Sequence, residues 1–310
     1  MNCTVVIAAY NEAVTIRDVV RRTLAQMSAV RAALPAGMSL LSNPSVIVVD
    51  DGSTDGTVQA LTGLPVTVLR NATNEGKAMS IWRGAQRALA DGAGAVITLD
   101  GDAQHSPEDI PRLLHAAATR PGAIVIGARL HARERIPLVR YGANRFANFW
   151  IAWAAGQPIA DSQSGFRLYP ATVFRDLYVG HERRSSFVFE SEVLIEASKQ
   201  GFAIVSVPVS VTYANAPRAS HFRPVADFWR ISTMVAGRLL RDGMNLPGLV
   251  RSLRLPGGSR VHSSFDPTPR TPSLPLSTPR RRLASIAALL RGRGGKSARR
   301  VRAANGTHDG

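Results

Sequence analysis

The residues with the clearest chemical meaning follow an apolar run at positions 93–99. Asp100, Asp102 and Gln104 occupy every second position after it. Alternate residues of an extended chain point to the same side, so the two carboxylates leave the strand end together, and Gln104 joins them if the chain stays extended. Carboxylate and amide oxygens suit Mg²⁺ or Mn²⁺, and so few protein ligands leave coordination positions for substrate phosphates. The pattern predicts a divalent-cation site, with a solvated acidic loop as the alternative.

A second acidic pair, Asp50 and Asp51, follows the apolar run 46–49. Acidic side chains beyond a strand end can hydrogen-bond a nucleobase or the hydroxyls of a ribose. The alternative is a turn that starts a helix, because Ser53 and Asp55 are both good N-cap residues, and the two roles can coexist. The chain has neither a Gly-x-Gly-x-x-Gly nor a Walker sequence, which argues against a dinucleotide-dependent oxidoreductase and a P-loop enzyme.

The positions of both acidic pairs depend on the strands and helices that precede and follow them. In the first half of the chain, strand-like runs alternate with helix-like segments, which predicts an α/β fold with a mostly parallel sheet and helices on both faces. Ligands of such sheets bind beyond the carboxyl ends of the strands, where both pairs lie. The expected strands are 4–9, 46–49, 66–69, 95–99 and 123–126, and the expected helices are 13–34, one from 55, 76–91 and one from 106.

The second half of the chain mixes helices with isolated strands. We expect helices at 140–155 and 189–200, a loop and short strand at 161–168, a strand at 203–212, and a basic amphipathic segment at 223–254 broken near Pro247. The first of these helices carries aromatic side chains at helical spacing, which predicts core packing, with a lipid-facing helix as the alternative. These aromatic residues are Phe146, Phe149, Trp150 and Trp153.

The net charge of +16 is unevenly distributed. Residues 256–310 carry eleven Lys and Arg against two Asp, a net charge of +9, and their high content of Pro, Ser, Arg and Gly predicts a mostly disordered tail. Such a tail either attracts an anionic partner or is solvated without a dedicated one. Further arginines, interleaved with apolar residues, predict a helix that lies on anionic lipid; they are Arg223, Arg230, Arg238 and Arg241.

The start of the sequence and its hydropathy bear on location. Met1 to Cys3 lead directly into an apolar strand without the basic and apolar regions of a secretory signal, and no run of 18 apolar residues occurs. We therefore expect a cytoplasmic protein, peripheral on the cytoplasmic face of the membrane. Cys3 is the single cysteine, so an internal disulfide is excluded.

Seven short motifs occur in the order typical of family 2 glycosyltransferases with a GT-A fold. The chain resembles most the polyprenyl-phosphate sugar transferases, the dolichyl-phosphate mannose synthases among them. The resemblance covers residues 4 to about 230. It implies a glycosyltransferase domain at 1–255, with a nucleotide-sugar half at 1–128 and an acceptor half at 129–255, before the tail. The motifs lie at 9–12, 50–53, 74–77, 100–105, 127–129, 161–169 and 220–221.

The resemblance implies a metal-dependent inverting transferase that moves a sugar from a GDP- or UDP-sugar to a lipid-linked acceptor, foremost a polyprenyl phosphate. The residues that it assigns to the donor are Ala8, Tyr10, Glu12, Asp50, Asp51, Lys77, Asp100 and Gly101. It assigns Mg²⁺ or Mn²⁺ to Asp100, Asp102 and Gln104, and it assigns Asp161, Arg129 and Arg167 to the phosphates, the sugar and the acceptor.

The chemistry of the acceptor leaves alternatives open. A phosphate monoester is anionic at pH 7 and needs no general base, whereas a hydroxyl acceptor of a glycolipid or polysaccharide needs a carboxylate to take its proton. Asp161 is then the first candidate and Glu190 the second, with a structural cap as the alternative role of Asp161. Glu192 and Glu196 are expected on a solvated helix face. A nucleic-acid-binding protein is disfavoured, because acidic residues occupy the strand ends.

Overall fold

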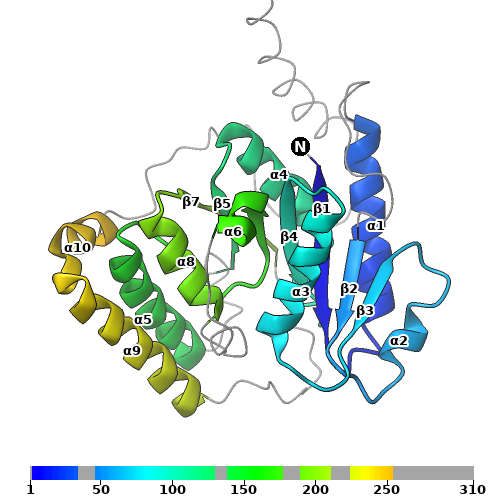
Figure 1. The fold of residues 1–310 in the computed structure, drawn as a ribbon, viewed down its shortest axis with the longest axis horizontal. Helices are drawn as coiled ribbons and strands as arrows, with labels where there is room; N and C mark the ends of the chain where they lie inside the picture. The colour runs from blue at the N-terminus through cyan, green and yellow to red at the C-terminus, as the bar shows by residue number, and fades with distance from the viewer. Residues whose placement is uncertain (1, 34–45, 130–137, 177–188, 211–223, 254–310) are drawn as a thin grey trace, which may run out of the picture.

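The computed structural model describes residues 2–33, 46–129, 138–176, 189–210 and 224–253. Within them a seven-stranded sheet is covered by helices on both faces (Figure 1). In the first half the elements are β1 (Cys3–Ala9), α1 (Ile16–Ala33), β2 (Val46–Asp50), α2 (Thr57–Ala60), β3 (Thr67–Arg70), α3 (Lys77–Ala90), β4 (Ala95–Asp100), η1 (Pro107–Asp109), α4 (Ile110–Thr119) and β5 (Ile124–Ala128). In the second half they are α5 (Leu138–Ala155), β6 (Arg167–Pro170), α6 (Ala171–Asp176), α8 (Phe189–Lys199), β7 (Ile204–Pro208), α9 (Pro224–Arg241), η3 (Gly243–Asn245) and α10 (Leu246–Leu253).

The sheet has the strand order β3-β2-β1-β4-β6-β5-β7. All neighbouring strands run parallel except β6, which is antiparallel to both β4 and β5. The mostly parallel sheet and the two helical layers expected from the sequence are therefore confirmed. The position and direction of β6 were not foreseen, because a four-residue strand after a loop carries no periodic signal of its direction.

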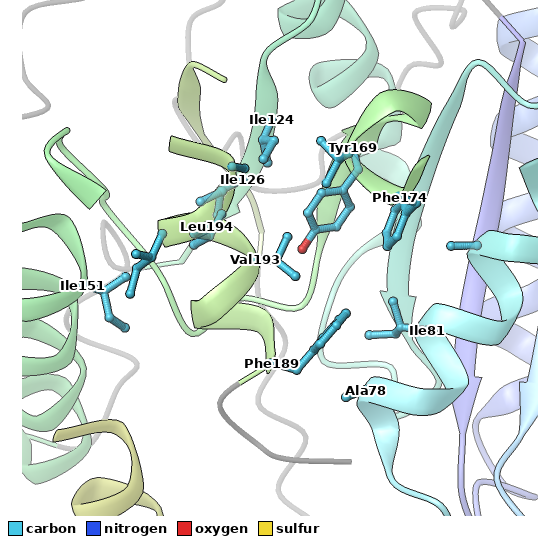
Figure 2. Packing of buried hydrophobic residues seen from close by; sticks show 14 of the residues in the cluster. Ala78, Ile81, Ile124, Ile126, Ile151, Tyr169, Phe174, Phe189, Val193 and Leu194 are labelled. Carbon is cyan, nitrogen blue, oxygen red and sulfur yellow. The ribbon is translucent and has the colours of Figure 1, made fainter. Parts of the chain in front are cut away.

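Alternation along the strands produces two hydrophobic cores, one on each face of the sheet. Val6 and Ile126 face the layer of α3, α5 and α8, whereas Val5 and Val125 face α1 and α4. Figure 2 shows the first core, where Phe189 of α8 lies near α3 together with aromatic side chains of β6 and α6. Strands buried on both faces read as continuous apolar runs, as these do.

The aromatic helix α5 packs only in part against the core, and the lipid-facing alternative stays a prediction. Trp153 is buried in the first core, and its indole nitrogen donates a hydrogen bond of 3.0 Å to the carbonyl of Met244. Trp150 stacks on it, with 5.2 Å between the ring centroids. Phe146 and Phe149 are 45% and 38% exposed, so only part of the aromatic set packs inside the protein.

The basic segment differs from its expected form in two ways. It breaks at Gly243 and Met244, both at positive φ, whereas Pro247 lies in the first turn of α10, where proline is compatible with a helix. Arg238 also faces the protein, since it contacts Glu196 at 2.7 Å and Glu192 at 3.9 Å. Arg241 is exposed, as a lipid-facing arginine would be.

Several other expectations are corrected or fall outside the described residues. Glu192 is only 4% exposed, so it does not lie on a solvated face, because α8 turns it toward Arg238. The helix expected from residue 55 is the single turn α2. No helix among the described residues has the length and apolarity that a membrane crossing needs. The motif at 220–221, Arg223, the side chain of Arg230 and the tail 256–310 lie outside the described part of the chain.

Substitution of Gly84 tests the contact between α3 and the sheet. A Cβ atom at Gly84 would collide with Val6 Cγ1 and come within 3.0 Å of Val49 Cγ2. We expect Gly84→Ala to lower the free energy of unfolding by about 1–3 kcal/mol, because the core has no room for the methyl group. Urea unfolding measures this. The control is Gly142→Ala in α5, where a Cβ meets nothing within 4 Å; it should raise stability by up to about 1 kcal/mol. Equal effects at both positions would contradict the packing argument.

Candidate active site

The candidate site lies at the edge of the sheet where the parallel strands end. Because β6 is antiparallel, it enters the sheet at that same edge, and its first residue, Arg167, pairs with Thr98 of β4 and Ile126 of β5. The hydroxyl of Thr98 donates a hydrogen bond of 2.7 Å to the carbonyl of Gly165. The loop 161–166 is thereby placed beside the ends of β4 and β5.

The turn after β1 forms one side of the site. Ala8, Tyr10 and Glu12 are each partly buried. The amide of Gly101 donates to the carbonyl of Ala8 at 3.1 Å, so the turn after β4 lies directly against β1. The hydroxyl of Thr15 lies 2.8 Å from both Glu12 Oε2 and the carbonyl of Gly101. The structure therefore brings these four donor residues of the sequence prediction together.

Asp51 holds the segment that leads into α3. Its carboxylate is 3% exposed and accepts hydrogen bonds on Oδ1 from Asn71 Nδ2 at 2.7 Å and from the amide of Glu75 at 2.9 Å. Oδ2 accepts the amide of Gly76 at 2.9 Å. Gly76 precedes the first residue of α3, Lys77, so Asp51 positions that lysine.

Asp50 holds the turn after β2. Its buried carboxylate accepts the amide of Ser53 at 3.2 Å and lies 3.2 Å from Arg70 Nε. Gly52, with φ of 73°, allows the turn to pass close to the next loop, since a Cβ there would lie 2.6 Å from the carbonyl carbon of Thr73. In this structure Asp50, like Asp51, binds the protein's own groups.

Lys77 connects the end of β4 with the start of α8. Its Nζ lies 2.7 Å from Asp100 Oδ1 and 3.2 Å from Glu190 Oε1. Burial alone would raise the pKa of Asp100, but the neighbouring basic groups, Lys77 foremost among them, together outweigh it and hold the pKa below its ordinary value. Gly165 makes room for the cluster, because a Cβ there would lie 2.5 Å from Lys77 Nζ and 2.8 Å from Asp100 Oδ2.

Asp102 is the second carboxylate of the predicted cation site. Burial and the negative charge of Asp100 raise its pKa to about 6. The chain does not stay extended beyond it, because Ala103 has φ of 61° and the amide of Gln104 donates to Asp102 Oδ1 at 3.0 Å. Gln104 is therefore placed by a turn and not by the strand-like alternation that the sequence suggested, and its part in holding a metal stays a prediction.

The two carboxylates fit a hard divalent cation whose remaining ligands come from a substrate. The carboxylates of Asp100 and Asp102 repel each other, and this repulsion contributes to the raised pKa of Asp102. Among the described residues, no group of three His, Cys, Asp or Glu side chains is arranged to hold a metal ion. Mg²⁺ and Mn²⁺ commonly take one or two protein carboxylates and complete their coordination with substrate phosphates, so the donor atoms of this acidic pair suit such an ion.

Arg129 and Asp161 form a buried ion pair next to this site. Arg129 Nε lies 2.8 Å from Asp161 Oδ2, which also accepts the backbone amide of Arg129 at 3.0 Å. Oδ1 accepts Arg129 Nη2 at 3.1 Å. Burial opposes ionisation of Asp161, but Arg129 outweighs it and holds the pKa of Asp161 below its ordinary value. Asp161 is fully buried, so in this structure it positions Arg129.

Arg167 is fully buried and binds main-chain carbonyls. Its guanidinium donates to the carbonyls of Ser162 and Ser164, both at 2.6 Å, and of Glu190 at 2.8 Å. It also donates to the hydroxyl of Tyr169 at 3.0 Å. Arg167 thus fixes both the loop 161–166 and the first turn of α8, and its role in this structure is positional.

His105 lies beneath the acidic pair. Its Nδ1 is 4.0 Å from Asp100 Oδ2, its Nε2 is 3.4 Å from the hydroxyl of Ser164, and its ring packs against Phe166. Burial lowers its pKa to about 4 although Asp100 opposes the shift, so the ring is neutral at pH 7. The sequence analysis did not connect His105 or Gly165 with Asp100. Neither residue has a spacing that would reveal the contact.

Comparison with known proteins identifies the family of the chain. The family model Glycosyl transferase family 2 matches residues 4–177, which is more than half of the chain. The chain belongs to glycosyl transferase family 2. An uncharacterized protein of Methanocaldococcus jannaschii is 33% identical over 180 residues, which are 54% of this chain and 76% of that protein.

A second relative carries a specific name. The undecaprenyl-phosphate 4-deoxy-4-formamido-L-arabinose transferase of Pectobacterium carotovorum subsp. carotovorum (strain PC1) is 33% identical over 195 residues. The match covers 60% of this chain and 54% of that transferase, so the chain spans about half the length of this relative. The chain is thus a glycosyltransferase with relatives among the polyprenyl-phosphate sugar transferases.

Solved structures show the same fold. Mannosyl-3-phosphoglycerate synthase from Rubrobacter xylanophilus matches with a TM-score of 0.57 at 18% identity, over 84% of this chain and 79% of that one. Glucosyl-3-phosphoglycerate synthase from Mycobacterium tuberculosis, in complex with Mn²⁺, UDP and phosphoglyceric acid, matches with a TM-score of 0.51 at 20% identity, over 77% of this chain and 78% of that one. The GT-A-type fold expected from the sequence is confirmed.

The Arg129–Asp161 pair yields a stability prediction. Asp161→Asn leaves the Arg129 charge buried without its counter-charge, so we expect the free energy of unfolding at pH 7 to fall by about 3 kcal/mol. Because the pKa of Asp161 is lowered on folding, the contribution of its charge is present above about pH 4 and declines as the pH falls toward the folded-state pKa. The difference between wild type and variant should shrink in the same direction.

Urea unfolding between pH 7 and pH 3 measures both effects. The matched control is Asp91→Asn, which removes an exposed ion pair with Arg87 and should change stability by less than about 1 kcal/mol. A loss at Asp161 no larger than that at Asp91, or a difference that grows on acidification, would contradict the assignment of a buried ion pair.

Proposed function

We propose that this chain is a metal-dependent inverting glycosyltransferase that moves a sugar from a GDP- or UDP-sugar to a polyprenyl phosphate. The observation that carries the proposal is the acidic pair Asp100 and Asp102 beside Lys77 at the ends of the strands. In a family 2 chain, this arrangement supports binding of a nucleoside diphosphate through a cation. A structural neighbour with this fold, glucosyl-3-phosphoglycerate synthase, is in complex with Mn²⁺ and UDP, which supports use of a cation and a nucleoside diphosphate.

The residues have separable parts in this proposal. A divalent ion held by Asp100 and Asp102, with Gln104 as a further candidate, would neutralise charge on the donor diphosphate and so improve the leaving group. Lys77 and Arg129 would add positive charge at the phosphates. Direct attack by the acceptor then inverts the anomeric centre, because the incoming oxygen approaches opposite the departing diphosphate.

The remaining donor residues would form the nucleotide pocket. Ala8, Tyr10 and Glu12 flank the acidic pair through the turn after β1. Asp50 and Asp51 face the protein in this structure, so they would act on the nucleotide by shaping the turns that line its pocket. Mg²⁺ or Mn²⁺ is the proposed cofactor.

A phosphate acceptor agrees with the state of the two candidate bases. Asp161 is occupied by Arg129, and Glu190 lies 3.2 Å from Lys77. A hydroxyl acceptor would need one of these carboxylates to leave its cation and take a proton, whereas a phosphate monoester attacks as an anion. The named Pectobacterium relative, whose acceptor is undecaprenyl phosphate, supports the same choice. Arg167 would contribute by holding the loop 161–166 at the acceptor end.

A transfer assay tests the function. The full chain is incubated with Mn²⁺, undecaprenyl phosphate and a panel of radiolabelled UDP- and GDP-sugars, and label entering the organic phase is counted. We expect transfer from one donor with undecaprenyl phosphate and none with undecaprenol, because the phosphate supplies the nucleophile. Asp102→Asn should lower the rate at least about a hundredfold, since it removes a charge that holds the cation.

A surface variant serves as the control of the transfer assay, and three results would refute parts of the proposal. Asp91→Asn, on the surface at the end of α3, should transfer at the wild-type rate. Normal turnover by Asp102→Asn, or full turnover in EDTA, would refute the metal assignment. Label transferred to undecaprenol or to a polysaccharide, and not to undecaprenyl phosphate, would establish a hydroxyl acceptor instead.

The chain would work on the cytoplasmic face of the membrane, bound to anionic lipid. The last described helix, α10, exposes Leu246, Val250 and Leu253. Arg241 and Arg251 are exposed on the same part of the fold, next to the residues at which the basic tail begins. Apolar side chains flanked by cations are the features that bind a helix to an anionic surface. Nucleic acid remains the disfavoured partner.

Removal of the tail tests the electrostatic part of this contact. Without residues 256–310 the chain loses a net charge of +9. We expect at least about tenfold weaker binding to vesicles that contain phosphatidylglycerol, and little change with phosphatidylcholine alone. Co-sedimentation measures the affinity, and transfer to a short-chain soluble polyprenyl phosphate shows that the truncated domain still works. An unchanged affinity for the anionic vesicles would show that the tail is no anchor.

A further inference from the structure

The Lys77 ammonium lies where four segments of the chain meet. Lys77 is the first residue of α3, and its ammonium contacts Asp100 at the end of β4 and Glu190 at the start of α8. The fourth segment is the loop before β6, where Gly165 packs closely against the pair, since a Cβ there would lie 2.5 Å from Lys77 Nζ. The position is therefore built for a cation between two carboxylates, and the protein supplies that cation itself.

Both carboxylates are held from other directions. Asp100 belongs to a strand paired with β1 and β6 on either side. The main chain of Glu190 is fixed by Arg167, whose Nη1 donates to its carbonyl at 2.8 Å. Lys77 is fixed in turn through Gly76 and Asp51. The main chains of the three charged residues are thus placed by the fold, so that their side chains meet at one point.

We infer that Lys77 is a built-in competitor of the divalent cation: it neutralises Asp100 and Glu190 in the metal-free protein and must give up Asp100 when the ion binds. One carboxylate oxygen, Asp100 Oδ1, lies 2.7 Å from the ammonium, so a cation bound there meets a like charge at close range. The inference rests on the proposed metal site at Asp100 and Asp102 and on neither the donor nor the acceptor.

The competition has a consequence for the order of binding. An ion that arrives alone must displace Lys77 without offering it a new anionic partner. An ion that arrives with a nucleoside diphosphate brings phosphate oxygens, to which the released ammonium can bind. Lys77 therefore links the affinity for the cation to the presence of the diphosphate, and this linkage is reciprocal.

The test measures Mn²⁺ alone, without donor or acceptor. Electron paramagnetic resonance of free Mn²⁺ gives its dissociation constant for the full-length wild type and for Lys77→Met. We expect Lys77→Met to bind Mn²⁺ at least about fivefold more tightly, because the competing charge is gone. Lys77→Arg keeps the charge and should keep the weak wild-type affinity. Adding Asp102→Asn to Lys77→Met should abolish the gain, which places the ion at the acidic pair.

The matched control is Lys199→Met. Lys199 also forms an ion pair of 2.7 Å, with Asp242, but on another part of the fold. It should leave the Mn²⁺ affinity unchanged, and thermal unfolding shows that both Lys→Met variants fold. Unchanged or weaker binding by folded Lys77→Met would overturn the inference, as would an equal gain in Lys199→Met.

A second variant separates the role of Glu190. Glu190→Gln removes one of the two anions that retain Lys77, so Lys77 pairs more closely with Asp100 and the Mn²⁺ affinity should fall slightly, by less than the gain in Lys77→Met. A loss of Mn²⁺ binding of tenfold or more would make Glu190 a ligand of the ion and would contradict the inference. Because no sugar transfer is measured, failure here is distinguishable from failure of the proposed function.

Discussion

The antiparallel insertion of β6 between β4 and β5 is the constraint on which the site depends. Parallel strands bring only their carboxyl ends to the ligand-binding edge of a sheet. A strand of opposite direction brings its beginning, and with it the loop that precedes it. Gly165 therefore lies next to Asp100 at the end of β4, and Asp161 next to Arg129 just after β5, although these residues are distant in sequence.

Around this edge, charge is balanced within the protein in two separate units. The Arg129–Asp161 pair is buried and closed, with both carboxylate oxygens bound to the arginine. The Lys77 unit is more open, with 40% of the lysine side chain and 22% of the Asp100 side chain exposed. A closed ion pair holds a shape, whereas a half-open one can exchange partners. The Arg129–Asp161 pair thus lies in the interior, whereas the Lys77 unit reaches the surface of the site.

The sequence predicted most of the fold, because its strands are apolar runs and its helices are amphipathic, and both signals are local. It also predicted that Asp100 and Asp102 lie together, because their spacing within one segment is itself the signal; their use as a cation site stays a prediction. It did not predict the contacts of Lys77 with Glu190 or of Gly165 with Asp100, which depend on the direction of β6. The sequence also did not show that Asp51 and Arg167 hold main-chain segments in place. A residue type shows what a side chain can bind, but not whether main-chain groups of the protein already occupy it.

The guanidinium of Arg167 joins the loop 161–166 to the first turn of α8 through carbonyls of both segments. Neither segment can leave its place without giving up a hydrogen bond to a buried positive charge, which has no water to replace it. We therefore expect the two segments to open to solvent as one cooperative unit, with joint exchange of their amide hydrogens. Movement of either segment alone is thereby disfavoured, because it would cost the buried guanidinium part of its hydrogen bonds.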